Sequence, residues 1–289
     1  MKKVLWLLIP FILLGAYLYK PEARTPVSEL ALSVIPENPI QGEPVLIMVN
    51  GTTSVESIKF NGRELRIFEH EGKPSALAGI DLRAETGEYD VEVSTVQSRT
   101  LHKKLAVGER VIAKVPLGIP EKLGGDTPEA EQELINTLVK EAVIINAVPS
   151  GDKKLWSSKF RFPLEGEIFV TDSYGYSRIT LGSTISHKGA DFRAEVGTPV
   201  YAMNKGFVAY TGFLRNYGHT IIIDHGLGLH TVYMHLSKVE VEEGKRANKG
   251  DLIGYSGDTG YVLGPHLHIS VRINHISIDP MKFMEILGE

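Results

Sequence analysis

Short stretches in which apolar and polar residues alternate recur along most of this chain. Residues 87–94 (GEYDVEVS) and 264–273 (GPHLHISVRI) have the clearest alternation. Successive side chains of a β-strand point to opposite faces, so this period of two is typical of a strand with one buried face. The pattern predicts a mainly β protein in which turn residues separate many short strands.

The first such region covers residues 26–107. Asn61-Gly62 lies there between two apolar runs, and this residue pair favours a two-residue hairpin turn. Several short strands in so short a region predict a small antiparallel sandwich of immunoglobulin-like size. We find no group of chemically reactive side chains in it.

A linker with one helix is predicted between residues 108 and 159. Thr127 is a typical helix cap, and Pro128 suits the first helical position because no N–H partner is needed there. Apolar residues then recur with helical spacing. We expect them to form one packed face: Leu134, Ile135, Leu138, Val139 and Ala142.

Residues 160–289 differ in composition from the linker before them, with clustered glycines and short apolar runs. They predict an all-β domain of antiparallel sheets whose loops frame a groove. The predicted fold class is therefore mainly β, with an N-terminal immunoglobulin-like sandwich, one connecting helix and a C-terminal antiparallel β-sheet domain. Eight of the ten histidines lie in this last region, from His187 onward.

Residues 1–25 carry a targeting pattern. Lys2 and Lys3 precede an uncharged apolar run from Val4 to Tyr19. This arrangement predicts a signal peptide or a membrane anchor, and the poor cleavage site favours a retained anchor. We therefore expect contact with a membrane through this segment. The rest of the chain is expected in the cell envelope, outside the cytoplasmic membrane, either periplasmic or extracellular.

The composition narrows the chemistry. A net charge of −4 provides no basic surface for nucleic acid, so no such partner is expected. The chain has no cysteine, which excludes disulfides, thiolate nucleophiles and Cys-ligated zinc. Any metal site must be built from His, Asp and Glu. Catalytic zinc commonly has three protein ligands and keeps a further position for water.

Three short motifs in the last region supply candidate residues. They are His187 and Asp191 in SHKGADF, His235 in TVYMHLS, and His266 and His268 in GPHLHISVRI. On a regular strand His266 and His268 share one face, and His235 points to the same side as Tyr233. Each motif alone is a weak signal, because such spacings also arise by chance.

In their order and surroundings, these motifs resemble the lysostaphin-like zinc metallopeptidases, which are peptidoglycan-cleaving endopeptidases of bacterial envelopes. The resemblance extends over residues 160–283, and the upstream sandwich resembles, more weakly, a module of some exported members. It implies one Zn²⁺ per chain. The implied zinc ligands are His187, Asp191 and His268, and the implied catalytic histidines are His235 and His266.

The resemblance implies a zinc-dependent endopeptidase that hydrolyses peptide bonds in peptidoglycan cross-links through metal-activated water. Peptidoglycan peptides are thus the expected partner. The two catalytic histidines would take the proton of water and protonate the leaving amine. The sequence does not assign which histidine does which. One departure stands out: Ile269 and Ser270 follow the His-x-His motif, where family members often have an aromatic residue and an acid.

Two other interpretations remain open. The domain could be a non-catalytic, cell-wall-binding regulator of other wall hydrolases, although a regulator has no need of a complete ligand set. Alternatively, the sandwich or the linker could cover the groove until activation. The bond that is cut and the oligomeric state do not follow from the sequence.

Overall fold

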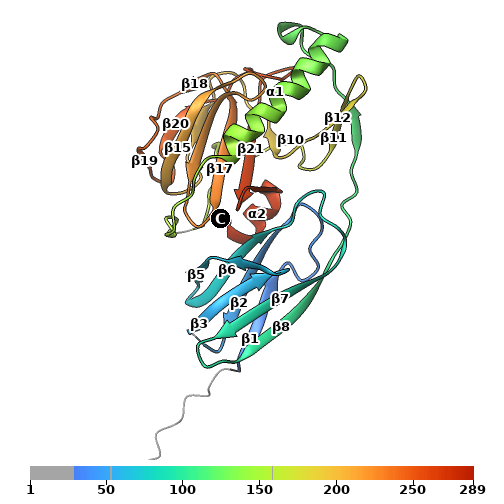
Figure 1. Cartoon of the computed structure of the whole chain (residues 1–289). Coiled ribbons are helices and arrows are strands. Elements are labelled where there is room, and N and C mark those ends of the chain that lie inside the picture. Colours follow the sequence, from blue (N-terminus) through green and yellow to red (C-terminus); the bar gives the residue numbers. More distant parts are fainter. Residues whose placement is uncertain (1–28, 53, 158) are drawn as a thin grey trace, which may run out of the picture.

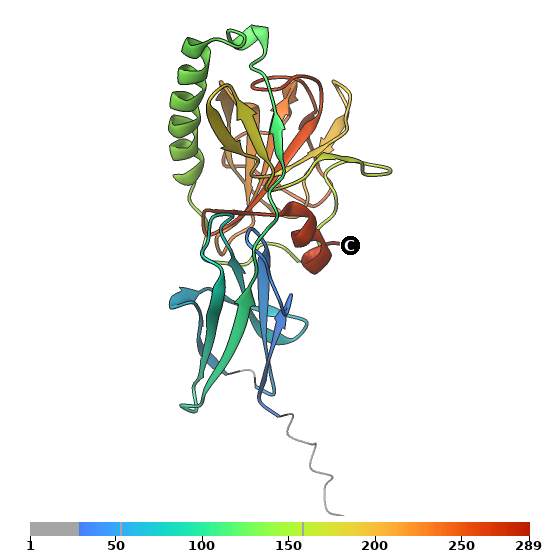
Figure 2. The same cartoon turned by 90° about the vertical axis from the view of Figure 1, so that its right-hand side faces the viewer.

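The computed structural model of this chain describes residues 29–52, 54–157 and 159–289. Two β domains are stacked end to end, and a long helix stands along one side of the C-terminal domain (Figure 1, Figure 2). The chain is mainly β, as predicted. The predicted signal or anchor at residues 1–25 lies outside the described residues. Within the described ranges, neither α-helix combines the length and apolar character needed to cross a membrane.

The N-terminal domain is a sandwich of two four-stranded antiparallel sheets, in the orders β1-β2-β6-β5 and β4-β3-β7-β8. The strands are β1 (Ala31–Ile35), β2 (Pro44–Asn50), β3 (Val55–Phe60), β4 (Arg63–Leu65), β5 (Ile67–His70), β6 (Lys73–Gly79), β7 (Gly87–Thr95) and β8 (Thr100–Val107). The predicted hairpin is confirmed: Asn61 and Gly62 join β3 to β4 with φ of 47° and 77°, which glycine and asparagine adopt readily.

The C-terminal domain is built on an antiparallel sheet of eight strands. Its order is β10-β13-β21-β17-β16-β15-β19, and β22 also pairs with β21. The strands are β10 (Val170–Asp172), β13 (Ala190–Phe192), β15 (Gly206–Leu214), β16 (Gly218–Asp224), β17 (Leu229–Leu236), β19 (Arg246–Ala247), β21 (Leu267–Ile273) and β22 (Ile276–Ile278). The apolar set predicted for the last long strand is fully buried in the core beneath the sheet.

Two small sheets complete this domain. In one, β14 (Pro199–Tyr201), β20 (Leu252–Tyr255) and β18 (Lys238–Val239) pair side by side. In the other, β12 (Ser183–Ser186) pairs with β11 (Ser177–Thr180), and β11 pairs in parallel with β9 (Lys114–Pro116). Because β9 belongs to the predicted linker, that linker forms part of the C-terminal fold.

After β9 the chain passes a 3₁₀ turn (Glu121–Leu123) and returns along the domain as helix α1 (Pro128–Asn146; Figure 2). The predicted cap is confirmed, since the Thr127 side chain accepts a hydrogen bond from the Ala130 N–H at 3.2 Å. The predicted packed face is partly wrong. Leu134 is fully buried, but 63% of Val139 is exposed. Five residues at 3.6 per turn rotate a side chain by about 140°, which places Val139 beyond the packed stripe.

A second helix, α2 (Pro280–Leu287), was not predicted. It starts as α1 does, with a capping residue followed by proline: the Asp279 side chain accepts from the Met281 N–H at 3.0 Å. The helix lies between the two domains (Figure 1). It is therefore part of the junction between the sandwich and the C-terminal domain.

The sandwich has a hydrophobic core of its own, and one of its faces also packs into the core of the C-terminal domain. Phe68 of the sandwich packs edge-on against Trp156, with ring centroids 5.2 Å apart. Leu46 and Met48 belong to the same buried cluster as the C-terminal core. The junction also holds a buried ion pair, with Arg110 Nη2 3.0 Å from Asp279 Oδ2. The sandwich is thus packed firmly against the C-terminal domain.

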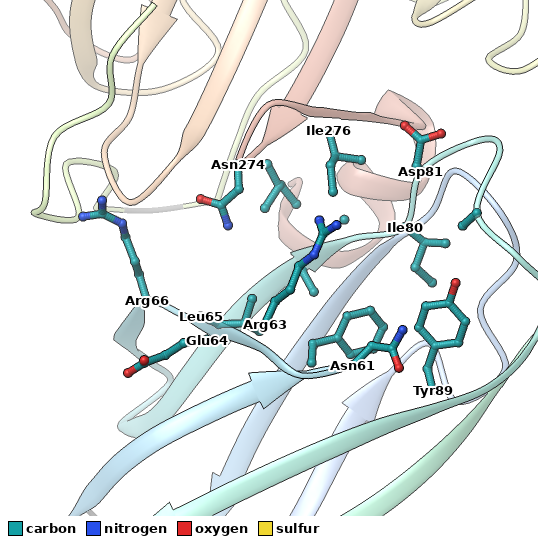
Figure 3. A pocket seen from close by; sticks show the side chains of 15 residues that line it. Asn61, Arg63, Glu64, Leu65, Arg66, Ile80, Asp81, Tyr89, Asn274 and Ile276 are labelled. Carbon is teal, nitrogen blue, oxygen red and sulfur yellow. The ribbon is translucent and has the colours of Figure 1, made fainter. Parts of the chain in front are cut away.

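A cavity of about 380 Å³ remains at this junction, between the sandwich and the β21–β22 turn (Figure 3). Its charged side chains are two arginines, Arg63 and Arg66, and two acids, Glu64 and Asp81. All its lining residues lie in the described ranges, and none is a histidine. The candidate catalytic groups therefore lie elsewhere, in the C-terminal sheet.

Candidate metal centre and active site

Strands β13, β21 and β17 lie side by side and bring the three predicted motifs together. Asp191 on β13 is paired in register with His268 on β21, and His268 is paired with Met234 on β17. His187 lies in the loop just before β13. The structure thus collects residues that are up to 81 positions apart in sequence.

Three of these side chains converge on one point. His187 Nε2 lies 3.0 Å from Asp191 Oδ1 and 3.1 Å from His268 Nδ1. His268 Nδ1 lies 2.6 Å from the same Asp191 oxygen. All three residues are buried. This spacing suits a single metal ion held by two imidazole nitrogens and one carboxylate oxygen.

Backbone carbonyls orient three histidines of the site. His187, His235 and His266 each place Nδ1 near a carbonyl, those of Ser173 (2.9 Å), Thr259 (2.8 Å) and Gly264 (3.0 Å) respectively. A carbonyl can only accept, so each Nδ1 carries the proton and each Nε2 carries the lone pair. We assign these tautomers from the hydrogen bonds.

His268 is oriented in the opposite sense. The Ser270 hydroxyl donates to the Lys188 carbonyl, so its oxygen is free to accept from His268 Nε2–H at 3.3 Å. The lone pair of His268 is then on Nδ1, toward Asp191. Lone pairs from three atoms therefore face one another, an arrangement that a bound cation would satisfy. The donor set fits the predicted metal.

A glycine makes this close approach feasible. Gly189 lies between His187 and Asp191, and a Cβ atom there would collide with His268 Nε2 and the Ile269 carbonyl. Any larger residue would push β13 away from β21. The SHKGADF motif thus needs its glycine for packing as well as its two candidate ligands.

His235 reaches the site by an irregularity that the sequence pattern did not predict. Tyr233 points into the core, where its hydroxyl accepts from the Met203 N–H at 2.9 Å. Regular alternation would place His235 on that same core side, and this prediction is wrong. The β16–β17 register shifts beside it, and His235 has φ of 60°. This left-handed backbone, which histidine adopts more often than most residues, turns the imidazole toward His268.

His266 completes the group. Its ring centroid is 4.9 Å from that of His235. His266 Nε2 is 3.6 Å from Asp191 Oδ2 and is the buried side-chain atom that lacks a hydrogen-bond partner among the described residues. A buried acceptor without a partner is costly, which indicates a place that a ligand fills. Both predicted catalytic histidines thus lie beside the candidate ligands.

Burial tunes the titration of this group. It lowers the pKa of His268 to about 4, and burial together with the neighbouring histidines holds the pKa of His235 well below its usual range. Burial alone would raise the pKa of Asp191. The neighbouring imidazoles of His268 and His187 outweigh it and hold that pKa well below its usual range. At neutral pH His235 and His268 are therefore neutral and the Asp191 carboxylate is ionised, as metal binding requires.

Arg178 is a site residue that the sequence analysis missed. Its Nη2 donates to Asp191 Oδ2 at 3.0 Å, and its Nε donates to the Tyr176 hydroxyl at 2.7 Å. Arg178 therefore binds Oδ2 of Asp191 and leaves Oδ1 available to a metal ion. No short-range pattern marks Arg178, because the contact depends on β11 folding over the end of β13.

Pockets open on both sides of the centre. One, which we call the helix-side pocket, has a volume of about 140 Å³ and is lined by α1 residues such as Leu138 and by His187, His235 and His268. The other is lined by Arg178, Asp191 and His266 among others. Asn216, Tyr217 and Tyr261, three loop residues, also line the helix-side pocket. The centre is thus bordered by two pockets, which an extended peptide could occupy.

The fold and this donor set define a class of site, a candidate metal centre of two histidines and one aspartate in an antiparallel β domain. Comparison with known proteins identifies the family. Peptidase family M23 matches residues 185–280, a segment that contains all five candidate residues. Residues 185–280 are thus a peptidase M23 domain, homologous to peptidoglycan endopeptidases such as ShyA.

Two relatives illustrate the similarity. Peptidoglycan DD-endopeptidase ShyA of Vibrio cholerae is 34% identical over 124 residues, which cover 42% of this chain and 29% of that protein. Glycyl-glycine endopeptidase ALE-1 of Staphylococcus capitis is 42% identical over 123 residues, 40% of this chain and 34% of that protein. The chain thus spans about a third of the length of these relatives.

The similarity of fold extends beyond the catalytic domain. A crystal structure from Pseudomonas aeruginosa, assigned to peptidase M23, superposes with a TM-score of 0.57 at 23% identity. The alignment covers 85% of this chain and 94% of that one. The arrangement of sandwich and peptidase domain therefore has a counterpart among solved structures.

Proposed function

We propose that this protein is a zinc-dependent endopeptidase that hydrolyses peptide bonds in bacterial peptidoglycan. The observation that carries the proposal is the convergence of His187 Nε2, Asp191 Oδ1 and His268 Nδ1 at 2.6–3.1 Å, next to two further imidazoles, those of His235 and His266. These three atoms would hold the metal. The names of the M23 relatives support peptidoglycan as the substrate and the cell envelope as the location.

Bound zinc would supply Lewis acidity, which polarises a carbonyl and makes water a nucleophile near neutral pH. The protein side chains do the rest. His235 and His266 each present an Nε2 lone pair, so each can take a proton from water and return it to the departing amine. Arg178 keeps Asp191 ionised and in place. The buried surroundings strengthen all these interactions.

The test is mass analysis of purified peptidoglycan after incubation with the zinc-loaded full chain. New peptide fragments that a chelator abolishes are the expected result, and their masses would identify the bond. An intact wall in the presence of demonstrably bound zinc would contradict the proposal and favour the wall-binding regulator. Wall preparations from species with different cross-links would separate a wrong substrate from an inactive protein.

A further inference from the structure

The helix-side pocket carries positive charge without any acid. Its charged lining residues are Arg178, Lys188 and Arg272, and none of the described residues that line it is an aspartate or glutamate. Arg178 is neutralised by Asp191, but the other two cations have no such partner. This contrasts with the net charge of −4 of the whole chain and with the balanced cavity at the domain junction.

Arg272 is the unusual member of this set. Its side chain is mostly buried, and in the described part of the chain no carboxylate oxygen lies within 4 Å of its guanidinium. It donates only to neutral oxygens, those of Asn146, His275 and Ser277. A buried arginine is usually paired with an acid, because removing its charge from water is costly.

Part of the guanidinium is still available. The Arg272 Nε–H has no acceptor among the described residues, and this atom is not fully buried. The Tyr217 hydroxyl, which also lines the pocket, likewise has no hydrogen-bond partner in the described part of the chain. Two donors are thus ready for an anionic acceptor in the same pocket.

Arg272 has a fixed relation to the metal centre. His268, Ser270 and Arg272 alternate along β21 and share the face that lines the pocket. Four residues of a strand rise about 13 Å, so Arg272 lies about that far along β21 from His268. An extended peptide would cover this distance in about four residues.

We propose that Arg272 binds a carboxylate of the peptide substrate about four residues from the bond that is cut, with the Tyr217 hydroxyl and Lys188 as supporting donors. The inference rests on the proposed peptidase function and specifies its substrate class as acidic peptides. Arg272 would be a specificity-determining residue, since an uncharged peptide leaves its guanidinium buried and unpaired.

The experiment compares two preparations of soluble cross-linked muropeptides, one with free carboxylates and one converted to amides with ammonia and a carbodiimide. Full-length, zinc-loaded protein is expected to cut the free form with a kcat/KM about 10- to 100-fold higher, the usual effect of a charged hydrogen bond. In Arg272→Gln this preference should fall to about 1. Arg272→Lys should keep part of it.

Controls separate recognition from folding. Arg246→Gln removes an arginine far from the pocket, whose guanidinium lies over the Phe207 ring 5.2 Å from its centroid, and should keep the full preference. Equal cutting of both preparations by the wild type would overturn the inference. So would a loss in Arg272→Gln that is equal for both, because that indicates only a brace between α1 and the β21–β22 turn.

Failure of the proposed function is distinguishable. If the wild type cuts neither preparation, equilibrium binding of the same two preparations decides: a preference for the free form that Arg272→Gln loses supports the inference, and equal binding overturns it. Synthetic peptides amidated only at their C-terminus then identify the source of the carboxylate. A lost preference indicates the chain end, and a retained one indicates an internal acid.

Discussion

At the scale of single residues, the site is organised by neutral hydrogen-bond partners. Three carbonyls and one serine hydroxyl each accept a hydrogen bond from the N–H of one histidine ring, and the other ring nitrogen faces the centre. Such partners fix the tautomer and the ring orientation of a metal-binding histidine. Candidate ligands and candidate proton carriers therefore differ in position, and each presents the lone pair of one ring nitrogen to the centre.

His268→Ala and His266→Ala should separate binding from catalysis. His268→Ala is expected to lose zinc and hydrolysis together, because one of three donors is removed. His266→Ala should retain about one zinc per chain and lose about 100-fold or more in rate, the usual contribution of a proton-transferring group. Metal analysis and hydrolysis assays measure both quantities. Wild-type rates in His266→Ala would disprove the role assigned to it.

Arg178→Gln should weaken zinc binding about 10- to 100-fold, the typical effect of losing a partner that orients a ligand. The Asp191 carboxylate would then be free to rotate. Competition with a chromophoric chelator measures the affinity without any assay of activity. Tyr176→Phe, which removes only the 2.7 Å contact to Arg178 Nε, should have a smaller effect. Unchanged affinity in Arg178→Gln would exclude the positioning role.

His225 should make the folded state sensitive to acid. Burial lowers its pKa from 6.5 to about 4, and its Nδ1 donates to the Lys205 carbonyl at 2.9 Å. The unfolded chain takes up the proton near pH 6.5, whereas the folded chain does so only near pH 4. The contribution of His225 is therefore complete above about pH 6.5 and is lost as pH falls to about 4.

Over that range the loss is about 3 kcal/mol. Urea unfolding at several pH values measures it, with His225→Gln as the comparison. The variant should be less stable at pH 7 and should lose less stability on acidification than the wild type. Parallel curves for the two proteins would contradict the assignment.

At the scale of elements, α1 connects the linker to the groove. Leu134 packs with Tyr261 in one buried cluster, while the Glu141 carboxylate accepts from the Asn216 N–H at 3.1 Å. The backbone carbonyl of Tyr217, the next residue, accepts a hydrogen bond from the His235 N–H at 2.9 Å. The helix thus supports the loop that in turn supports the irregular backbone at His235.

Paired substitutions on α1 test which of its faces is packed. Leu134→Ala should lower the free energy of unfolding by about 2–5 kcal/mol, as expected for a fully buried leucine. Val139→Ala should change it by less than about 0.5 kcal/mol, because that side chain is exposed. Denaturant titration gives both values. A large loss at Val139 would mean that this face is covered in solution.

At the scale of the whole molecule, the sandwich and the peptidase domain depend on each other. Phe68 contacts Trp156 across the junction, and Arg110 pairs with Asp279 there. The helix-side pocket is lined by α1, β11 and β12 as well as by the main sheet. A fragment without the sandwich would leave part of the shared core exposed.

Phe68→Ala therefore should destabilise both domains together by about 3–5 kcal/mol. Fluorescence of Trp156 and far-UV circular dichroism should report one coincident transition, shifted to lower denaturant. Val96→Ala, at a side chain that is 65% exposed, is the matched control and should leave the midpoint unchanged. Two separate transitions would indicate that the domains unfold independently.

Much of the fold was predictable because its signals are local. The alternation in β7 and β21, the Asn61-Gly62 turn and the cap at Thr127 each depend on a few neighbouring residues. Helix α2 could have been predicted by the same rule, since Asp279-Pro280 repeats the cap-and-proline signal. The exposed position of Val139 could not, because it depends on which side of α1 meets the sheet.

The sequence by itself determined the class of the fold, the family and the five candidate residues, since motif order and residue chemistry are written along the chain. The tertiary structure decided how those residues act. It turned His235 out of the core through a left-handed backbone, brought Arg178 onto Asp191 and left Arg272 without an acid beside the groove. Each of these depends on contacts between distant strands, and such contacts leave no mark in a local pattern.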